Sequence, residues 1–153
     1  MRIKYEWGWT ACLAVLILLF LIWGARADVY GGDSIACGAG HAAGAPTLCK
    51  VGAGSCEIAQ RVPQGLYGWV VVSAGVNDAG KCVAQVRARI GSVAKVLWIV
   101  PPPKYTTARA VILRVGQAHG DRFVTYIPGK DGLHPRSYPE LVRAIKATEA
   151  WAR

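Results

Sequence analysis

Several patterns that mark metal and cofactor sites are missing from this chain of 153 residues. No two cysteines have the close C-x-x-C spacing of a zinc site. Gly-Ala-Gly at 38–40 is half of a dinucleotide-binding fingerprint, but no G-x-G-x-x-G is completed and the run does not link a strand to a helix. A metal site would have to combine Cys37 and His41 with Cys49 or Cys56, which is the weaker alternative. We therefore expect no metal and no cofactor.

Acidic residues are scarce in the chain. It has 9 Asp and Glu against 18 Lys and Arg, so its formal net charge is +9. The basic residues are scattered, and no basic motif is interleaved with aromatic residues, which disfavours nucleic acid as a partner. A general attraction to anionic envelope polymers or to a membrane surface fits this charge better.

The longest apolar run lies at the N-terminus. Arg2 and Lys4 precede an apolar stretch over 11–23, and Ala-Arg-Ala at 25–27 offers small residues for cleavage, which is the order of a secretory signal peptide. We expect residues 1–27 to be cleaved and the protein to be exported, periplasmic or secreted. The alternative is a retained signal anchor that tethers the protein to the membrane, because residues 7–25 are nearly long enough to span a bilayer.

Residues 28–153 are expected to form one domain with a single core. The leader holds three basic residues and one acidic residue, so its removal lowers the net charge to +7. β-Branched and aromatic runs predict strands over 27–30, 47–51, 66–74, 93–100 and 122–127. Helices are expected over 34–43, 55–62, 80–90, 105–116 and 138–153. Alternation with short connections predicts an α/β fold, a three-layer α/β/α sandwich around a five-stranded parallel sheet.

Polar residues gather where the predicted strands end, which is where open α/β sheets bind their ligands. The set is Ser34, Gly52, Asn77, Asp131 and His134. Ser34 follows a glycine turn at the start of a helix, where free N–H groups stabilise developing negative charge. His134 is suited to take the proton of a serine hydroxyl near pH 7. Asp131 can accept the other ring N–H and fix the tautomer, as in a Ser-His-Asp triad.

The remaining members of this set are suited to hold an oxyanion. The N–H groups of Ser34 and Gly52 and the amide of Asn77 would supply three donors. Asp33 and Asp78 are expected to be scaffold residues that hydrogen-bond loop N–H groups beside the site.

At these positions the chain resembles the SGNH (GDSL-type) hydrolase superfamily, in the family's order. Gly-Asp-Ser-Ile at 32–35 is similar to the first block, Gly-Val-Asn-Asp at 75–78 to the G-x-N-D block, and Asp-Gly-Leu-His at 131–134 to the D-x-x-H block. The second block is the loosest match, and either Gly52 or Gly54 can supply its N–H. The resemblance implies a flavodoxin-like SGNH hydrolase fold and ester or thioester hydrolysis without a cofactor.

An activated serine with three oxyanion donors implies acyl transfer to water through an acyl-enzyme. The domain is small, so we expect an open site suited to a short acyl group on a larger carrier. The expected protein is a monomeric carboxylic ester hydrolase that removes acetyl groups from an envelope or extracellular polysaccharide. Lysophospholipase, thioesterase or arylesterase activity on a lipid or other ester is the alternative, and a non-catalytic glycan-binding domain is the alternative from another class.

Four cysteines remain beyond the leader, which contains Cys12. An even set in a chain bound for an oxidising compartment predicts two disulfides, for which three pairings exist. Cys56 and Cys82 each follow a loop of the expected site by a few residues. A bridge between them would clamp these two loops, and Cys37 would then pair with Cys49.

Overall fold

The computed structural model describes residues 28–62, 68–92 and 95–151. Residues 1–27, on which the expectations of a signal peptide or membrane anchor rest, lie outside these ranges. Within them, no helix has the length and apolar character needed to cross a bilayer.

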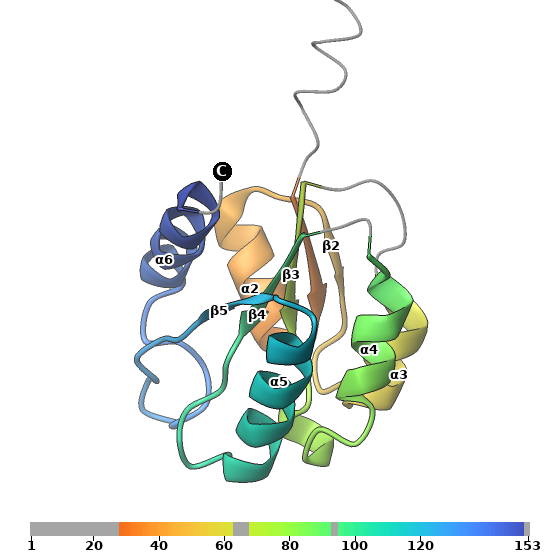
Figure 1. Cartoon of the computed structure of the whole chain (residues 1–153). Helices are drawn as coiled ribbons and strands as arrows, with labels where there is room; N and C mark the ends of the chain where they lie inside the picture. Colours follow the sequence, from red (N-terminus) through yellow and green to blue (C-terminus); the bar gives the residue numbers. More distant parts are fainter. Residues whose placement is uncertain (1–27, 63–67, 93–94, 152–153) are drawn as a thin grey trace, which may run out of the picture.

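Strands and helices alternate along the described chain (Figure 1). The strands are β1 (Val29–Gly32), β2 (Thr47–Cys49), β3 (Trp69–Ser73), β4 (Lys95–Ile99) and β5 (Arg122–Val124). The helices are α2 (Ser34–Ala43), α3 (Ser55–Arg61), α4 (Val83–Ile90), α5 (Thr106–Ala118) and α6 (Tyr138–Ala150), with a short 3-10 helix, η1 (Val76–Asp78), before α4. The predicted order of elements is confirmed.

The five strands are parallel and lie in the order β2-β1-β3-β4-β5. This is the flavodoxin-like order of doubly wound α/β proteins. The chain leaves β1 toward β2 on one side and returns to β3 on the other, so the order of the strands reverses between β1 and β3. Ligands of such folds bind outside the carboxyl ends of the strands at this reversal. We therefore expect a ligand site among the residues that follow β1 and β3.

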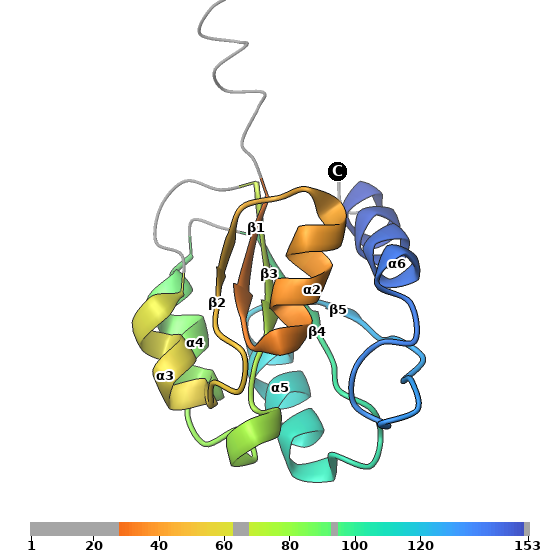
Figure 2. The same ribbon diagram turned by 180° about the vertical axis from the view of Figure 1, so that it is seen from behind.

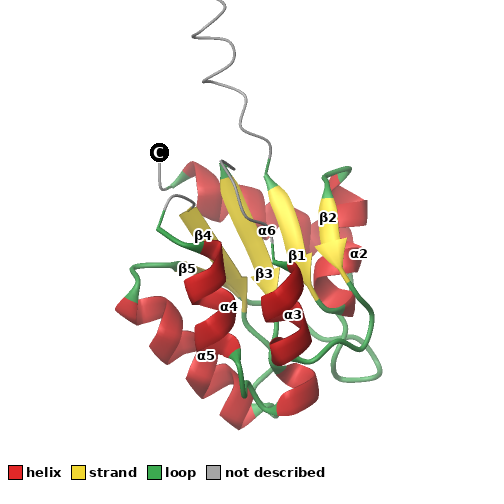
Figure 3. Cartoon of the chain, turned by 90° about the vertical axis from the view of Figure 1, so that its right-hand side faces the viewer, coloured by secondary structure: helices red, strands yellow, loops and turns green. Residues whose placement is uncertain are grey.

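Helices cover both faces of the sheet, which makes the three predicted layers. Figure 3 shows α3, α4 and α5 in front of the sheet and α2 and α6 behind it, and Figure 2 shows α2 against β1 and β3 from the other side. Successive side chains of β3 enter opposite layers: Val70 and Val72 pack with α3 and α4, whereas Val71 packs with α2 and α6. β3 is buried on both faces, as its continuous apolar sequence predicts.

The glycine pair after Tyr30 lies within β1, whereas the sequence pattern predicted that the strand would end there. Gly32 pairs with Cys49 on one side and Ser73 on the other. A β-carbon at Gly32 would stand 1.9 Å from the carbonyl oxygen of Ser73, and its φ is +137°. The glycine therefore permits a close approach of β1 and β3, and the chain turns only at Asp33.

Other differences from the predicted elements concern their ends. β5 stops at Val124, three residues before its predicted end, and an isolated antiparallel bridge between Pro128 and Pro135 closes the loop beyond it. α4 begins at Val83 and not at 80, because residues 79–82 form turns in which Ala79 and Gly80 have left-handed φ angles of +53° and +78°. The first residues of the predicted strands over 66–74 and 93–100 lie outside the described ranges.

Candidate active site

Ser34 is the first residue of α2, directly after the turn at Asp33. The Asp33 side chain caps the helix, accepting a hydrogen bond from the Ile35 N–H at 3.0 Å. The Asp33 N–H donates to the carbonyl of Ser73 at 3.1 Å, which ties the turn to the end of β3. The N–H of Ser34 belongs to the first turn of the helix, where backbone donors have no partner within the helix. The hydroxyl of Ser34 thus stands at the N-terminus of α2 and at the carboxyl end of β1, next to the Ser34 N–H.

Asp33 itself is buried, with 2% of its surface exposed. Burial raises the pKa of Asp33 to about 6, although hydrogen bonds from Ser73 and from the Ile35 and Ala36 N–H groups favour the ionised carboxylate. Its contacts are those of a residue that shapes the turn under Ser34, the scaffold role that the sequence suggested.

A hydrogen-bonded chain of three side chains begins at Ser34. The Ser34 Oγ lies 2.9 Å from Nε2 of His134, and Nδ1 of His134 lies 2.6 Å from Oδ2 of Asp131. The hydrogen bond with the His134 ring, together with the Leu133 N–H, lowers the pKa of Asp131 to about 2. An ionised Asp131 accepts from Nδ1–H, which leaves Nε2 free to accept a proton from Ser34.

The loop between β5 and α6 holds His134 toward Ser34. The Tyr126 hydroxyl donates to the Leu133 carbonyl at 2.7 Å, and the Gly129 N–H donates to the His134 carbonyl at 2.7 Å. Oδ1 of Asp131 accepts from the backbone N–H groups of Leu133 and His134 at 2.9 and 3.0 Å. Hydrogen bonds within the loop and to Tyr126 therefore fix both the backbone and the ring of His134.

Gly52 and Asn77 lie on the two loops that follow β2 and β3, and both residues are exposed. The Asn77 Nδ2 donates to the carbonyl of Ala53 at 2.9 Å, so the two loops are in direct contact. Gly52 has a φ of +76°, and a β-carbon there would meet no atom within 4 Å. At Gly54 the same β-carbon would lie 2.9 Å from Oδ2 of Asp78. Glycine is therefore required at position 52 by the backbone conformation and at position 54 by the lack of space beside Asp78.

Both predicted disulfides are present: Cys37 is bonded to Cys49, and Cys56 to Cys82. The first joins α2 to the end of β2, and the second joins the starts of α3 and α4. Four sulfurs are thus held in covalent bonds rather than available as metal ligands, and the described residues contain no cluster of His, Cys, Asp and Glu that could hold a metal ion.

The site is open to solvent. The side chains of His134 and Asp131 are 40% and 52% exposed. Lys104 reaches the same loop, with its Nζ 3.3 Å from the carbonyl of Asp131. His41 and His119 are exposed and take no part in the site.

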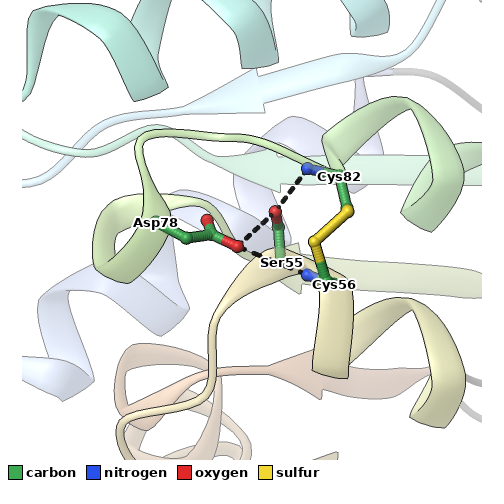
Figure 4. Close-up of a disulfide and its surroundings, with 4 residues drawn as sticks. All are labelled: Ser55, Cys56, Asp78 and Cys82. Carbon is green, nitrogen blue, oxygen red and sulfur yellow. Dashed lines mark hydrogen bonds between the residues drawn. A yellow bond between two sulfur atoms is a disulfide. The ribbon is translucent and has the colours of Figure 1, made fainter.

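One part of the site was missed at the sequence level. Ser55 was expected only as the first residue of the helix over 55–62, yet it is fully buried and bridges Asp78 to the backbone of Cys82 (Figure 4). The Gly-Ser sequence at 54–55 is common at the start of helices, and nothing in it signals that the hydroxyl crosses to another loop.

Comparisons with known proteins support the fold. No family model matches the sequence, and no curated protein sequence matches it. Among solved structures, the chain is similar to a GDSL-like lipase from Bacteroides thetaiotaomicron, with a TM-score of 0.61 over 82% of this chain and 88% of that one. The two sequences are 18% identical, so the similarity concerns the fold. The chain has the α/β/α fold of this lipase, as the resemblance to the SGNH (GDSL-type) superfamily predicted.

Proposed function

We propose that the protein is a serine ester hydrolase of the SGNH (GDSL) type. The observation that carries this proposal is the chain of hydrogen bonds from Ser34 through His134 to Asp131. Ser34 and His134 are 100 residues apart in the sequence, and each follows a different strand of the sheet. A nucleophile, a base and an orienting carboxylate in hydrogen-bond contact are the signature of an activated serine.

In the proposed reaction, Oγ of Ser34 attacks the ester carbonyl while Nε2 of His134 takes the hydroxyl proton. The resulting imidazolium is stabilised by the ionised Asp131. The tetrahedral intermediate collapses, the C–O bond to the alcohol breaks, and His134 returns the proton to the leaving oxygen. Water then attacks the acyl-enzyme by the same steps, which releases the carboxylic acid and restores the serine.

The proposed oxyanion hole consists of the N–H groups of Ser34 and Gly52 and the side-chain amide of Asn77. A primary amide has two N–H groups, and the contact with Ala53 uses one of them. The second is available for the oxyanion. Each such donor is typically worth about 100- to 1,000-fold in rate.

The proposed substrate is a short acyl ester, most simply an acetyl group, on an envelope or extracellular polysaccharide. The exposure of His134 and Asp131 supports a site that admits a carrier much larger than the reacting group. Two disulfides support an oxidising compartment and hence export. The net charge of +9, or +7 without residues 1–27, favours association with anionic envelope material.

A fluorophosphonate probe tests the activation of Ser34 without knowledge of the substrate. We expect peptide mass spectrometry to find the label on Ser34 of the full chain, and labelling to fall strongly in His134→Ala. A chain that stays unlabelled would favour the non-catalytic glycan-binding alternative. Acetate release from acetylated polysaccharides, compared with fatty-acid release from lysophospholipids, separates the polysaccharide reading from the lysophospholipase alternative.

A further inference from the structure

The loops that follow β2 and β3 are joined by a network centred on Asp78 (Figure 4). Oδ2 of Asp78 accepts hydrogen bonds from the Ser55 hydroxyl at 2.8 Å and the Cys56 N–H at 3.4 Å. The oxygen of Ser55 accepts in turn from the Cys82 N–H at 2.7 Å. The disulfide between Cys56 and Cys82 closes the ring covalently. The two bonds to Asp78 connect the start of α3 to η1, and the two links to Cys82 connect it to the residue before α4.

This network substitutes for ordinary helix caps. Neither Gly54, the N-cap of α3, nor Cys82, the N-cap of α4, provides a side-chain cap of its own. The contacts of Asp78 and Ser55 take two N–H groups that these helix starts would otherwise leave unpaired. Oδ1 of Asp78, by contrast, is buried and has no partner among the described residues, which costs free energy. Stability alone therefore does not account for a carboxylate at this position.

Asn77 immediately precedes Asp78 in η1. Its amide is oriented by the carbonyl of Ala53, two residues before Ser55. The bond from Asp78 to Ser55 therefore fixes the spacing of the same two segments that the bond from Asn77 to Ala53 spans. A shift of Asp78 would turn the second N–H of Asn77 away from its present direction.

We propose that Asp78 is a positioning residue that aims the Asn77 amide at the oxyanion through Ser55 and the Cys56–Cys82 bridge. This proposal rests on the proposed function, and it assigns to Asp78 a role in catalysis that acts only through Asn77. A displacement of about 1 Å in such a group can cost about 100-fold in rate.

A double-mutant cycle on p-nitrophenyl acetate tests the proposal in the full chain. We expect Asn77→Ala to lower kcat about 100- to 1,000-fold, and Asp78→Ala to lower it about 10- to 100-fold with KM little changed. In the Asn77→Ala background, Asp78→Ala should cost less than about 3-fold, because the group through which it acts is gone. Glu57→Ala is the matched control, because it removes a partly exposed carboxylate of α3 that pairs with Lys50 and Arg61, and it should leave kcat at the wild-type value.

A second variant, Gly54→Ala, displaces the Asp78 carboxylate without removing it. Gly54 has a φ of −80°, which alanine adopts freely, but its new β-carbon would press on Asp78. Gly54→Ala should therefore lower kcat when Asn77 is present. In a protein that already carries Asn77→Ala, the same substitution should lower kcat much less. Asp78→Asn keeps an acceptor for Ser55 and should retain more activity than Asp78→Ala. The side-chain amide resonances of Asn77 should shift in Gly54→Ala and stay in place in Glu57→Ala.

Three results would overturn the proposal. If Asp78→Ala and Gly54→Ala lower kcat by the same factor with Asn77 and with Asn77→Ala, Asp78 does not act through Asn77. Unchanged kcat in both variants would mean that it positions nothing. An unmoved Asn77 amide in Gly54→Ala would contradict the geometry whatever the activity. If the wild type and Ser34→Ala hydrolyse the ester at the same rate, the proposed function itself is wrong. This comparison separates that outcome from a failure of the proposal on Asp78.

Discussion

Asp131 binds His134 through both of its carboxylate oxygens. Oδ2 lies 2.6 Å from Nδ1 of the ring, and Oδ1 accepts the backbone N–H of the same residue at 3.0 Å. One side chain thus sets both the path of the loop and the orientation of the imidazole. This double contact depends on a separation of three positions between Asp131 and His134, which is the spacing of the D-x-x-H pattern in the sequence.

Asp131→Asn should keep much of this loop geometry and lose activity. Asparagine can accept the backbone N–H groups, but it cannot stabilise the imidazolium and can hold the ring in the wrong tautomer. We expect kcat to fall by about 10⁴-fold, as triad carboxylate substitutions do, with a small change in KM. Glu140→Gln, which changes an exposed carboxylate in the first turn of α6, is the control. A kcat within 10-fold of wild type for Asp131→Asn would remove Asp131 from the triad.

Gly52→Ala and Gly44→Ala form a matched pair. Both glycines have left-handed backbone angles, with φ of +76° and +62°, and neither has an atom within 4 Å of a new β-carbon. Each substitution should destabilise the fold by about 1 kcal/mol, the strain of alanine in this conformation. Only Gly52→Ala should also lower kcat, by at least about 10-fold, because a shifted N–H no longer meets the oxyanion. Urea unfolding and esterase kinetics measure the two effects, and equal kcat values for the pair would contradict the oxyanion role of Gly52.

Asp33 should make stability depend on pH. Its pKa of about 6 exceeds the ordinary value of 3.8, so the folded state binds more protons than the unfolded state between these values. The extra proton bound by folded Asp33 stabilises the fold fully below about pH 4, and this stabilisation is lost as the pH rises through about 6. Asp33→Asn keeps the helix cap and does not titrate. Relative to wild type, this variant should gain up to about 3 kcal/mol in the free energy of unfolding between pH 4 and pH 7. A constant difference between the two proteins over this range would show that Asp33 does not titrate as described.

The sequence was sufficient to predict the parallel sheet, the three layers, the bounds of α2 and the presence of two disulfides, whose pairing it left open. Each of these follows from a local pattern: apolar runs of strand length, a cap before a helix, or cysteines placed beside loops that a parallel sheet brings together. Ser34 was predicted to follow the first strand, and Asp131 and His134 to follow the fifth, for the same reason; in the structure the three side chains are in hydrogen-bond contact.

Other features depend on contacts between distant segments and could not be predicted. Gly31 and Gly32 have the sequence of a turn, but both pair with β2 and β3 and so continue β1. At Gly32 the approach of Ser73 leaves no room for a β-carbon. The burial of Ser55 and its bond to Asp78 likewise require the relative placement of α3 and η1. The catalytic roles of Gly52 and Asn77 stay predictions, because they concern a reacting group rather than a contact within the chain.

The most direct test of the account is the hydrolysis of p-nitrophenyl acetate by the wild-type protein and by Ser34→Ala. The substitution removes the nucleophile while the backbone donors and the His134–Asp131 pair remain. We predict clear turnover by the wild type and a fall of at least about 1,000-fold in kcat/KM for the variant. Equal rates for the two proteins would contradict the assignment of Ser34 as the nucleophile of an ester hydrolase.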